Sequence, residues 1–243
     1  MKNVFLKITE NFALTDSVWQ MTLEGDCTEI TKPGQFINIK LDGLYLRRPI
    51  SVYDCGDGFV TIIYKVVGKG TELMSTLKAG KELDILVGLG NGFDTSASGD
   101  KPVVIGGGVG VPPMYKLAKE LIAEGKKVTA ILGFNTKSEI FAEEEFKKIG
   151  CDVIVTTVDG SYGVKGFVTN AMDFDYTYTF CCGPEPMLKA VYNTGKTSGQ
   201  FSFEERMGCG FGACMGCSCK TITGYKRICK EGPVMRKEEI LWK

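Results

Sequence analysis

Four cysteines near the carboxyl end of the chain constrain its fold more than any other feature of the sequence. Cys209, Cys214 and Cys217 form a C-x4-C-x2-C pattern, and Cys229 follows after eleven further residues. Four thiolates with this close and then distant spacing are typical of the ligands of a plant-type [2Fe–2S] cluster. The glycines between them tolerate a left-handed backbone, so the segment can curl around one point. These glycines are Gly208, Gly210, Gly212 and Gly216.

Two other uses of these cysteines stay open. A structural zinc site favours C-x2-C pairs, and a four-residue gap rich in glycine suits zinc poorly. A disulfide-bonded loop belongs in an oxidising compartment, of which the rest of the sequence gives no sign. Cys219 adds an ambiguity, because it could replace Cys217 as a ligand. The two-residue spacing favours Cys217, and we interpret Cys219 as a neighbour of the site.

The composition narrows the class of protein. The chain has 243 residues, enough for one large domain or two moderate ones beside the cysteine segment. Basic and acidic residues number 29 each, and this balance argues against a surface for nucleic acid or for a charged membrane. No apolar run approaches the roughly 18 residues that span a bilayer. Residues 1–10 have no signal-peptide core, so we expect a cytoplasmic protein.

The chain contains ten cysteines and no histidine. Without histidine, the sequence excludes histidine-based acid–base catalysis, histidine-ligated metals and Rieske-type clusters. Ten cysteines in a cytoplasmic protein indicate metal or redox chemistry.

Residues 1–98 predict an antiparallel β-barrel. Turn pairs such as Asp42-Gly43 separate short runs rich in β-branched and aromatic residues, namely VFLKIT, VWQMTL, QFINIKL, FVTIIYKVV and ELDILV. Regular short strands of this kind favour a small barrel. One short helix is expected from Thr71 to Leu77.

The pattern changes at residues 96–102, where we place a domain boundary. Strands and helices alternate through residues 99–203, which predicts a Rossmann-like α/β domain with a parallel sheet covered on both faces. Residues 204–243 are predicted to be a small segment that carries the cysteines. The predicted fold class is therefore a multidomain α+β chain. In the α/β domain, helices are expected at about 112–124, 142–149 and 185–194.

Two motifs in the barrel are candidates for binding a phosphate. In Arg48-Pro49-Ile50-Ser51 the guanidinium can bind a phosphate, and the hydroxyl can donate a hydrogen bond beyond it. Farther on, Ile63-Tyr64-Lys65 ends a strand, and Gly70-Thr71 opens a short helix whose N-terminus favours anions. Thr71 is expected to be the N-cap of that helix. Either motif alone is weak, because such strings are common at ordinary turns.

A glycine-rich stretch in the α/β domain is a stronger candidate. Gly106, Gly107, Gly108 and Gly110 follow an apolar strand and precede a helix, the context of a nucleotide-binding fingerprint. Glycines there let a pyrophosphate approach the backbone. The spacing is not G-x-G-x-x-G, which leaves another nucleotide-binding lineage or a coincidence open.

A second candidate in the α/β domain lies at the end of its fourth strand, in Cys182, Gly183, Pro184 and Met187. Ligands of open α/β sheets bind outside the carboxyl ends of the strands. We therefore expect this segment to line the same crevice as the glycine stretch. Cys181 is expected to be buried and Cys182 to face the ligand.

In this order, the motifs RPIS, GxGT, GGGVGxPP and CGPxxM resemble the ferredoxin–NADP reductase superfamily. With C-x4-C-x2-C-x11-C at the end, the whole chain resembles the electron-transfer subunits of class 1B dihydroorotate dehydrogenases; the most specific segment is EERMGCGFGACMGC. The resemblance implies an FAD-binding barrel, an NAD-binding domain and a [2Fe–2S] segment. Lys65 departs from the superfamily, which often has arginine at this position. Arginine can bind a phosphate bidentately, whereas lysine cannot.

The resemblance also implies the roles of individual residues. Arg48, Pro49, Ile50 and Ser51 would contact the FAD, and Ser51 could hydrogen-bond its flavin ring. The middle of the FAD would lie on residues 63–65, and its phosphates on Gly70 and Thr71. The resemblance implies that the cluster ligands are Cys209, Cys214, Cys217 and Cys229.

The function that follows is electron transfer between NAD(H), FAD and the cluster. The sequence offers no candidate for binding orotate and no second flavin site. The resemblance therefore implies an FMN-containing catalytic subunit that oxidises dihydroorotate to orotate, with a heterotetrameric complex expected. Two alternatives remain: a subunit of a ferredoxin-linked NAD(P)H oxidoreductase or sulfide dehydrogenase, and a non-catalytic iron–sulfur or zinc sensor that binds a nucleotide.

The choice between NAD and NADP is predicted from the residues beyond the second strand of the nucleotide domain. Residues 135–145 contain one cation, Lys137, against four carboxylates. A 2′-phosphate would meet net repulsion there, and no arginine offsets it. These acids also suit an exposed helix start, which leaves a purely structural role open. The sequence predicts a preference for NAD(H).

Overall fold

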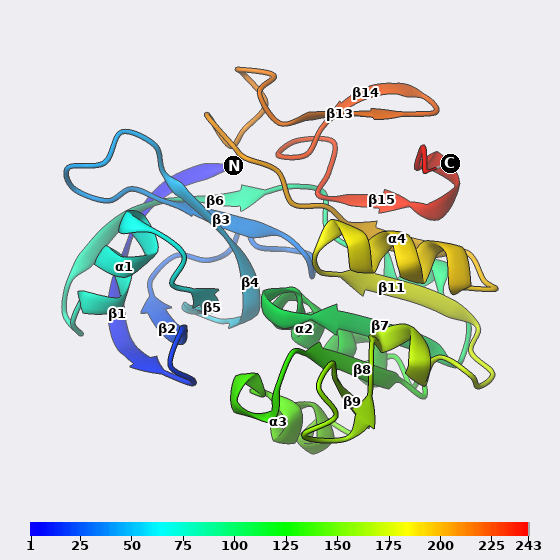
Figure 1. The fold of residues 1–243 in the computed structure, drawn as a ribbon. Coiled ribbons are helices and arrows are strands. Elements are labelled where there is room, and N and C mark those ends of the chain that lie inside the picture. Colours follow the sequence, from blue (N-terminus) through cyan, green and yellow to red (C-terminus); the bar gives the residue numbers. More distant parts are fainter. Residues whose placement is uncertain (243) are drawn as a thin grey trace.

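The computed structural model describes residues 1–242, so Lys243 lies outside the described residues. The chain begins with a closed barrel in the strand order β1-β2-β5-β4-β3-β6, with every neighbouring pair antiparallel (Figure 1). The predicted antiparallel barrel is confirmed. Its strands are β1 (Lys2–Ala13), β2 (Val18–Glu24), β3 (Phe36–Ile39), β4 (Arg48–Gly56), β5 (Phe59–Lys65) and β6 (Glu82–Leu89).

Alternating burial explains why these segments are strands. Along β6, Leu83, Ile85 and Val87 are buried and face the barrel core, while the residues between them are more exposed. Strand β4, which carries the RPIS motif, is missing from the sequence prediction. It forms because β3 and β5 pair with it on either side. Its sequence RPISVYDCG contains a proline, an aspartate and a glycine, so it gives little local strand signal.

Helix α1 (Lys69–Thr76) begins two residues before the predicted start, and the prediction that Thr71 is its N-cap is wrong. Gly68 is the N-cap, and Thr71 is the third residue of the helix. From there its hydroxyl accepts hydrogen bonds from the backbone N–H of Val67 (2.9 Å) and Gly68 (3.3 Å). The threonine therefore caps the helix from inside its first turn, which satisfies otherwise free amides.

The second domain is built on a sheet in the order β10-β9-β8-β7-β11-β12-β15, parallel except for β15. The Rossmann-like prediction is confirmed, although β10, β12 and β15 were absent from it. The elements are β7 (Pro102–Gly107), α2 (Val111–Ala123), β8 (Thr129–Phe134), α3 (Glu143–Lys148), β9 (Asp152–Thr157), β10 (Val164–Lys165), β11 (Tyr178–Cys182), α4 (Glu185–Thr194), β12 (Gly199–Ser202) and β15 (Val234–Arg236).

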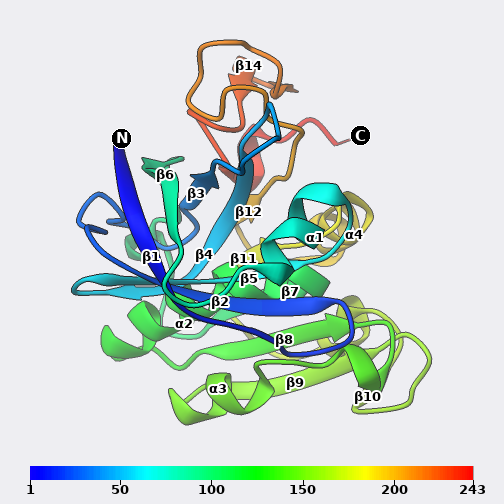
Figure 2. The same cartoon turned by 90° about the vertical axis from the view of Figure 1, so that its left-hand side faces the viewer.

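The cysteine segment lies at one end of the molecule, beyond β3 and β6 of the barrel (Figures 1 and 2). It contains a hairpin of β13 (Ser218–Thr221) and β14 (Gly224–Arg227). The chain then returns to the nucleotide domain, where β15 pairs antiparallel with β12. The short 3-10 turns are η1 (Thr95–Ala97), η2 (Gly108–Gly110), η3 (Lys137–Glu139), η4 (Val168–Ala171) and η5 (Lys237–Glu239).

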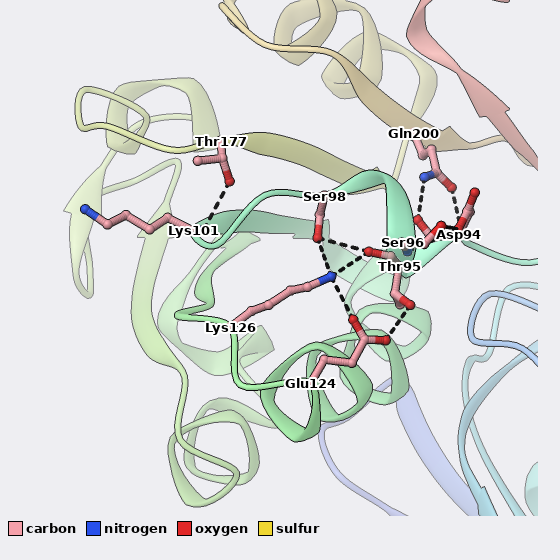
Figure 3. Close-up of polar contacts among 9 residues, drawn as sticks. All are labelled: Asp94, Thr95, Ser96, Ser98, Lys101, Glu124, Lys126, Thr177 and Gln200. Carbon is pink, nitrogen blue, oxygen red and sulfur yellow. Dashed lines mark hydrogen bonds and ion pairs between the residues drawn. The ribbon is translucent and has the colours of Figure 1, made fainter.

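Hydrogen bonds fix the connection between the two domains (Figure 3). Lys126, which follows α2, donates from Nζ to the Thr95 carbonyl (2.6 Å) and the Ser98 hydroxyl (2.8 Å). Gln200 on β12 accepts from the backbone N–H of Asp94 and donates to its carbonyl, both at 2.8 Å. The segment in which the sequence predicts a domain boundary is thus tied to the nucleotide domain.

The barrel and the nucleotide domain also contact each other through β4 and α2. The rings of Tyr53 and Tyr115 stack with centroids 4.4 Å apart, and Lys119 forms an ion pair with Asp54 at 2.7 Å. This contact holds the strand with the RPIS motif beside the glycine loop that precedes α2. Among residues 1–242, no helix is long and apolar enough to cross a membrane.

Candidate functional site

Arg48 on β4 lies directly over the first turn of helix α1. A β-carbon built on Gly70 would come within 2.0 Å of the Arg48 Nε. The guanidinium donates to the carbonyl of Leu46 and has no acidic partner among the described residues. Its neighbour Arg47 differs, since it pairs with Asp84 at 2.8 Å. An unpaired guanidinium beside a helix N-terminus is a site for a phosphate group.

The other residues of the predicted FAD site divide into accessible and buried ones. Pro49, Ile50 and Ser51 are partly exposed along β4. The Ile63 and Tyr64 side chains lie in the hydrophobic cores, and the Tyr64 hydroxyl donates to Asn11 Oδ1 at 3.0 Å. A ligand can therefore reach residues 63 and 64 only through their main-chain groups. The roles of these residues towards FAD stay predictions.

A cavity of about 490 Å³ opens between the barrel and the nucleotide domain. Lys65 lines it from the barrel side, so the end of the I-Y-K motif faces the nucleotide domain. The opposite wall brings together the two motifs predicted to share a crevice, and its residues from those motifs are Gly107, Gly108, Pro184 and Met187. The cavity is large enough for most of a dinucleotide and lies at the carboxyl end of the parallel strands.

Close backbone packing explains why the remaining motif glycines are needed. A β-carbon on Gly110 would come within 2.2 Å of the Cys182 carbonyl oxygen, and one on Gly106 within 2.6 Å of the Val111 Cα. A β-carbon on Gly183 would come within 2.4 Å of the Met187 side-chain Cε and within 3.2 Å of the backbone nitrogen of Gly107. These glycines do not line the cavity themselves; they let the glycine loop and the end of β11 meet behind it.

The two cysteines at the end of β11 are placed differently. Cys181 is fully buried, as predicted, and its neighbour Cys182 is partly exposed. Burial raises the pKa of the Cys182 thiol to about 12, an effect that a hydrogen bond with Ser202 partly offsets. Cys182 is therefore a neutral thiol at physiological pH, and it lies next to the cavity wall rather than in it.

Part of the stretch from which the choice of nucleotide is predicted lines the same cavity. Glu139 lines the wall and its carboxylate accepts from the backbone N–H (3.1 Å) and side-chain amide (2.9 Å) of Asn135. Lys137, the one cation of this stretch, lies 5.8 Å from the centroid of the Tyr162 ring. A carboxylate beyond the second strand is the group that binds the ribose hydroxyls of NAD.

In the cysteine segment, the four predicted ligands lie in two pairs. The Cys209 thiol accepts from the backbone N–H of Ala213 (3.2 Å) and Cys214 (3.4 Å). The Cys217 thiol accepts from the backbone N–H of Cys229 at 3.4 Å. Burial opposes ionisation of Cys209, but backbone amides, with Phe211 first, lower the pKa of its thiol to about 6. Iron is bound by thiolates, so backbone amides that stabilise the thiolate form of Cys209 favour iron binding by this loop.

This paired arrangement fits a two-iron cluster better than a single zinc ion. Among residues 1–242, no three histidine, cysteine or acidic side chains converge tightly enough to hold one metal ion. In a [2Fe–2S] cluster, by contrast, each iron takes two cysteines, so two separated pairs suffice. All ten cysteines are free thiols.

Cys219 lies on β13, apart from the two pairs. Its Sγ is 4.0 Å from the Met235 Sδ, and the residue lines a smaller cavity of about 280 Å³ near the carboxyl end. This placement agrees with its interpretation as a neighbour of the cluster site, although its role stays a prediction.

Sequence reasoning missed two asparagines that hold the cysteine segment on the barrel. Asn91 donates to the carbonyls of Glu231 (3.0 Å) and Val234 (2.7 Å) and accepts from the Val234 N–H (3.1 Å). Asn38 donates to the Cys209 carbonyl at 3.3 Å. Neither asparagine belongs to a motif, and only the folded chain brings them to residues more than a hundred positions away.

Comparison with known proteins identifies the family of this chain. The family model for the iron–sulfur cluster binding domain of dihydroorotate dehydrogenase B matches residues 204–241, and that for the oxidoreductase NAD-binding domain matches residues 104–193. A Bacillus pumilus protein is 42% identical over 99% of this chain and 98% of its own length; a Fusobacterium nucleatum protein is 43% identical over 96% of both. Both are named dihydroorotate dehydrogenase B (NAD(+)), electron transfer subunit. This chain belongs to that family.

A solved structure extends the comparison to the fold. The NADH-dependent reduced ferredoxin-NADP oxidoreductase, described in the context of flavin-based electron bifurcation, superposes with a TM-score of 0.90 at 29% identity over 98% of this chain and 90% of its own. The family resemblance stated from the motifs is thereby confirmed. The dihydroorotate dehydrogenase B subunits are more similar to this chain in sequence than this solved structure is, so the family is assigned from them.

Proposed function

We propose that the chain passes electrons between NAD(H), FAD and a [2Fe–2S] cluster, to or from an FMN-bearing catalytic subunit that converts dihydroorotate to orotate in pyrimidine biosynthesis. The observation that carries this proposal is the position of the four-cysteine loop on the barrel, beside the strand pair β3–β4, in a chain similar over its whole length to dihydroorotate dehydrogenase B electron transfer subunits.

The chain's own residues would provide three binding regions, one for each cofactor. Arg48 and the first turn of α1 would neutralise the FAD pyrophosphate. The cavity beneath the glycine loop would hold the dinucleotide, with Glu139 at its ribose and the end of β11 at its nicotinamide. The two cysteine pairs would hold the irons. Bound FAD supplies the step between two-electron exchange with NADH and one-electron exchange with the cluster.

The partner follows from the relatives' names. An electron transfer subunit requires a second chain on which the substrate is oxidised, and we propose that this chain carries FMN and assembles with ours as a heterotetramer. We further propose that the complex acts in the cytoplasm. The domain division at residues 98/99 and 203/204 stays part of this proposal, with the qualification that β15 joins the nucleotide sheet.

The second candidate function is that of a ferredoxin-linked NAD(P)H oxidoreductase or sulfide dehydrogenase subunit. The observation that favours it is the TM-score of 0.90 with the NADH-dependent ferredoxin-NADP oxidoreductase. The third candidate is a sensor that only binds a nucleotide, and the similarity of the whole chain to electron transfer subunits argues against it.

The test is reconstitution. The purified chain is mixed anaerobically with an FMN-containing dihydroorotate dehydrogenase catalytic subunit of class 1B, and NAD+ reduction is followed after dihydroorotate is added. We expect reduction only when both chains are present. Equal rates without this chain contradict the proposal, and reduction of ferredoxin but not of the FMN subunit by NADH supports the second candidate.

A further inference from the structure

Asn38 occupies an unusual position for a polar residue. It lies in the middle of β3, opposite Pro49 on β4 and Leu86 on β6. Its neighbours Ile37 and Ile39 face the barrel core, so the Asn38 side chain points out of the barrel. Only 1% of its surface is nevertheless exposed, because the cysteine loop covers it.

The contact between Asn38 and the loop is close and specific. Its side-chain Nδ2 donates to the carbonyl of Cys209, the first of the predicted cluster ligands, at 3.3 Å. Gly210 lies against the same amide: it has a φ of +78°, and a β-carbon there would come within 2.3 Å of Nδ2. The backbone of the loop therefore turns where it contacts Asn38. The turn requires glycine because its φ is positive and because a β-carbon would collide with the Asn38 amide.

The other end of the amide has no partner. Asn38 Oδ1 is buried and receives no hydrogen bond among residues 1–242. Turning the amide over would place this oxygen against the Cys209 carbonyl and replace attraction with repulsion. A buried oxygen without a donor destabilises a fold, so an apolar side chain of the same size would serve packing better. The group of Asn38 that stabilises the structure is therefore Nδ2, which donates to the Cys209 carbonyl.

We propose that Asn38 is a positioning residue that fixes the Cys209–Gly210 turn on β3 and so sets the place of the cluster relative to the flavin-bearing strand β4. Since Asn38 faces Pro49 directly across the β3–β4 pair, the first cluster ligand is anchored one strand away from the RPIS motif. This inference rests on the proposed function, because it takes Cys209 as a ligand of the cluster.

The experiment compares Asn38→Leu with the wild-type chain. Loss of iron and sulfide is followed during anaerobic incubation with a chelator, and the dithionite-reduced cluster is recorded by EPR. We expect the variant to fold with an unchanged or higher melting temperature of the cluster-free chain, to lose its cluster about tenfold faster, corresponding to one anchoring hydrogen bond, and to give a broadened EPR signal. Asn38→Asp, which cannot donate to Cys209 and adds a negative charge, should also lower the cluster's reduction potential.

Two control variants separate positioning from general damage. Gln35, just before β3, is a buried amide whose side chain accepts from Thr31 and Lys32 and donates to Gly90, so Gln35→Met should lower the melting temperature without changing the EPR signal. Gly210→Ala should reproduce the Asn38→Leu phenotype. Gly58→Ala, with a φ of +77° and open space around it, should not.

The outcomes are distinct. Faster cluster loss and a broadened signal in Asn38→Leu and Gly210→Ala, but in neither control, support the proposal. Wild-type rates and spectra in Asn38→Leu overturn it while leaving the proposed function intact. If the wild-type chain itself takes up no iron and sulfide, both the inference and the proposed function fail.

Discussion

Gly70 and Arg48 are in direct contact: a β-carbon on Gly70 would lie 2.0 Å from the Arg48 Nε. The glycine therefore does more than open helix α1, since it leaves room for the guanidinium to lie across the helix N-terminus. An arginine on a barrel strand and a glycine more than twenty positions later make one anion site.

Gly70→Ala should displace Arg48 and weaken FAD retention, because the new methyl group takes the space of the guanidinium. Loss of one charge-assisted contact worth about 1.5–3 kcal/mol predicts at least about tenfold weaker binding, and Arg48→Ala should match it. FAD content after extensive dialysis measures the effect. Gly58→Ala is the control, since nothing lies within 4 Å of the added carbon and the residue lies in the turn between β4 and β5, not at the start of α1. Full FAD occupancy in Gly70→Ala would show that the contact has no part in flavin binding.

Glu139 should make the chain prefer NADH to NADPH. Its carboxylate lines the cavity and would repel a 2′-phosphate, while Lys137 lies on the Tyr162 ring. We expect kcat/KM for NADH to exceed that for NADPH by about tenfold or more, equivalent to about 1.4 kcal/mol. Steady-state reduction of an artificial acceptor at fixed salt gives both values. Glu139→Gln should narrow the ratio; equal values in the wild-type chain would contradict the prediction.

The Cys182 thiol should not titrate in the working range of pH. Burial raises its pKa to about 12, so the thiol stays protonated at every pH well below that value and carries no charge between pH 6 and 9. The pH profile of kcat/KM for NADH should therefore be the same in the wild-type chain and in Cys182→Ser. A step between pH 8 and 9 that disappears in Cys182→Ser would show an ionising thiol.

Cys214→Ser should abolish cluster binding, and Cys219→Ser should leave it. Cys214 lies in a pair with Cys209, whereas Cys219 is on β13 with its sulfur 4.0 Å from that of Met235. Iron and acid-labile sulfide are assayed in both variants. A normal cluster in Cys214→Ser, or its loss in Cys219→Ser, would reverse the assignment.

The sequence predicts the fold well wherever its signal is local. Short runs rich in β-branched and aromatic residues predict five of the barrel strands, and strand–helix alternation predicts the nucleotide domain. It fails for β4, whose sequence RPISVYDCG mixes apolar residues with proline, aspartate and glycine, and for β15, which has only three residues. Both are strands because they pair with neighbouring strands in the folded chain. Thr71 fails for another reason: its hydroxyl can cap from the third helical position as well as from the N-cap, and the sequence does not distinguish the two.

The binding regions show the same limit. Cysteine spacing and glycine runs identify the segments, because those chemistries demand particular residues close together in the chain. The sequence does not reveal that Tyr64 points into the barrel core or that Lys65 faces the nucleotide cavity. Asn38 carries no signal at all, since its importance comes from a loop that begins 171 positions away.

The measurement that tests the account most directly is anaerobic reduction of the purified, cofactor-loaded chain by NADH, followed by visible absorbance and EPR. The account predicts that NADH bleaches the flavin absorbance and then produces the signal of a reduced [2Fe–2S] cluster, without any partner. A chain that contains flavin, iron and sulfide but whose absorbance and EPR spectrum NADH leaves unchanged would contradict it.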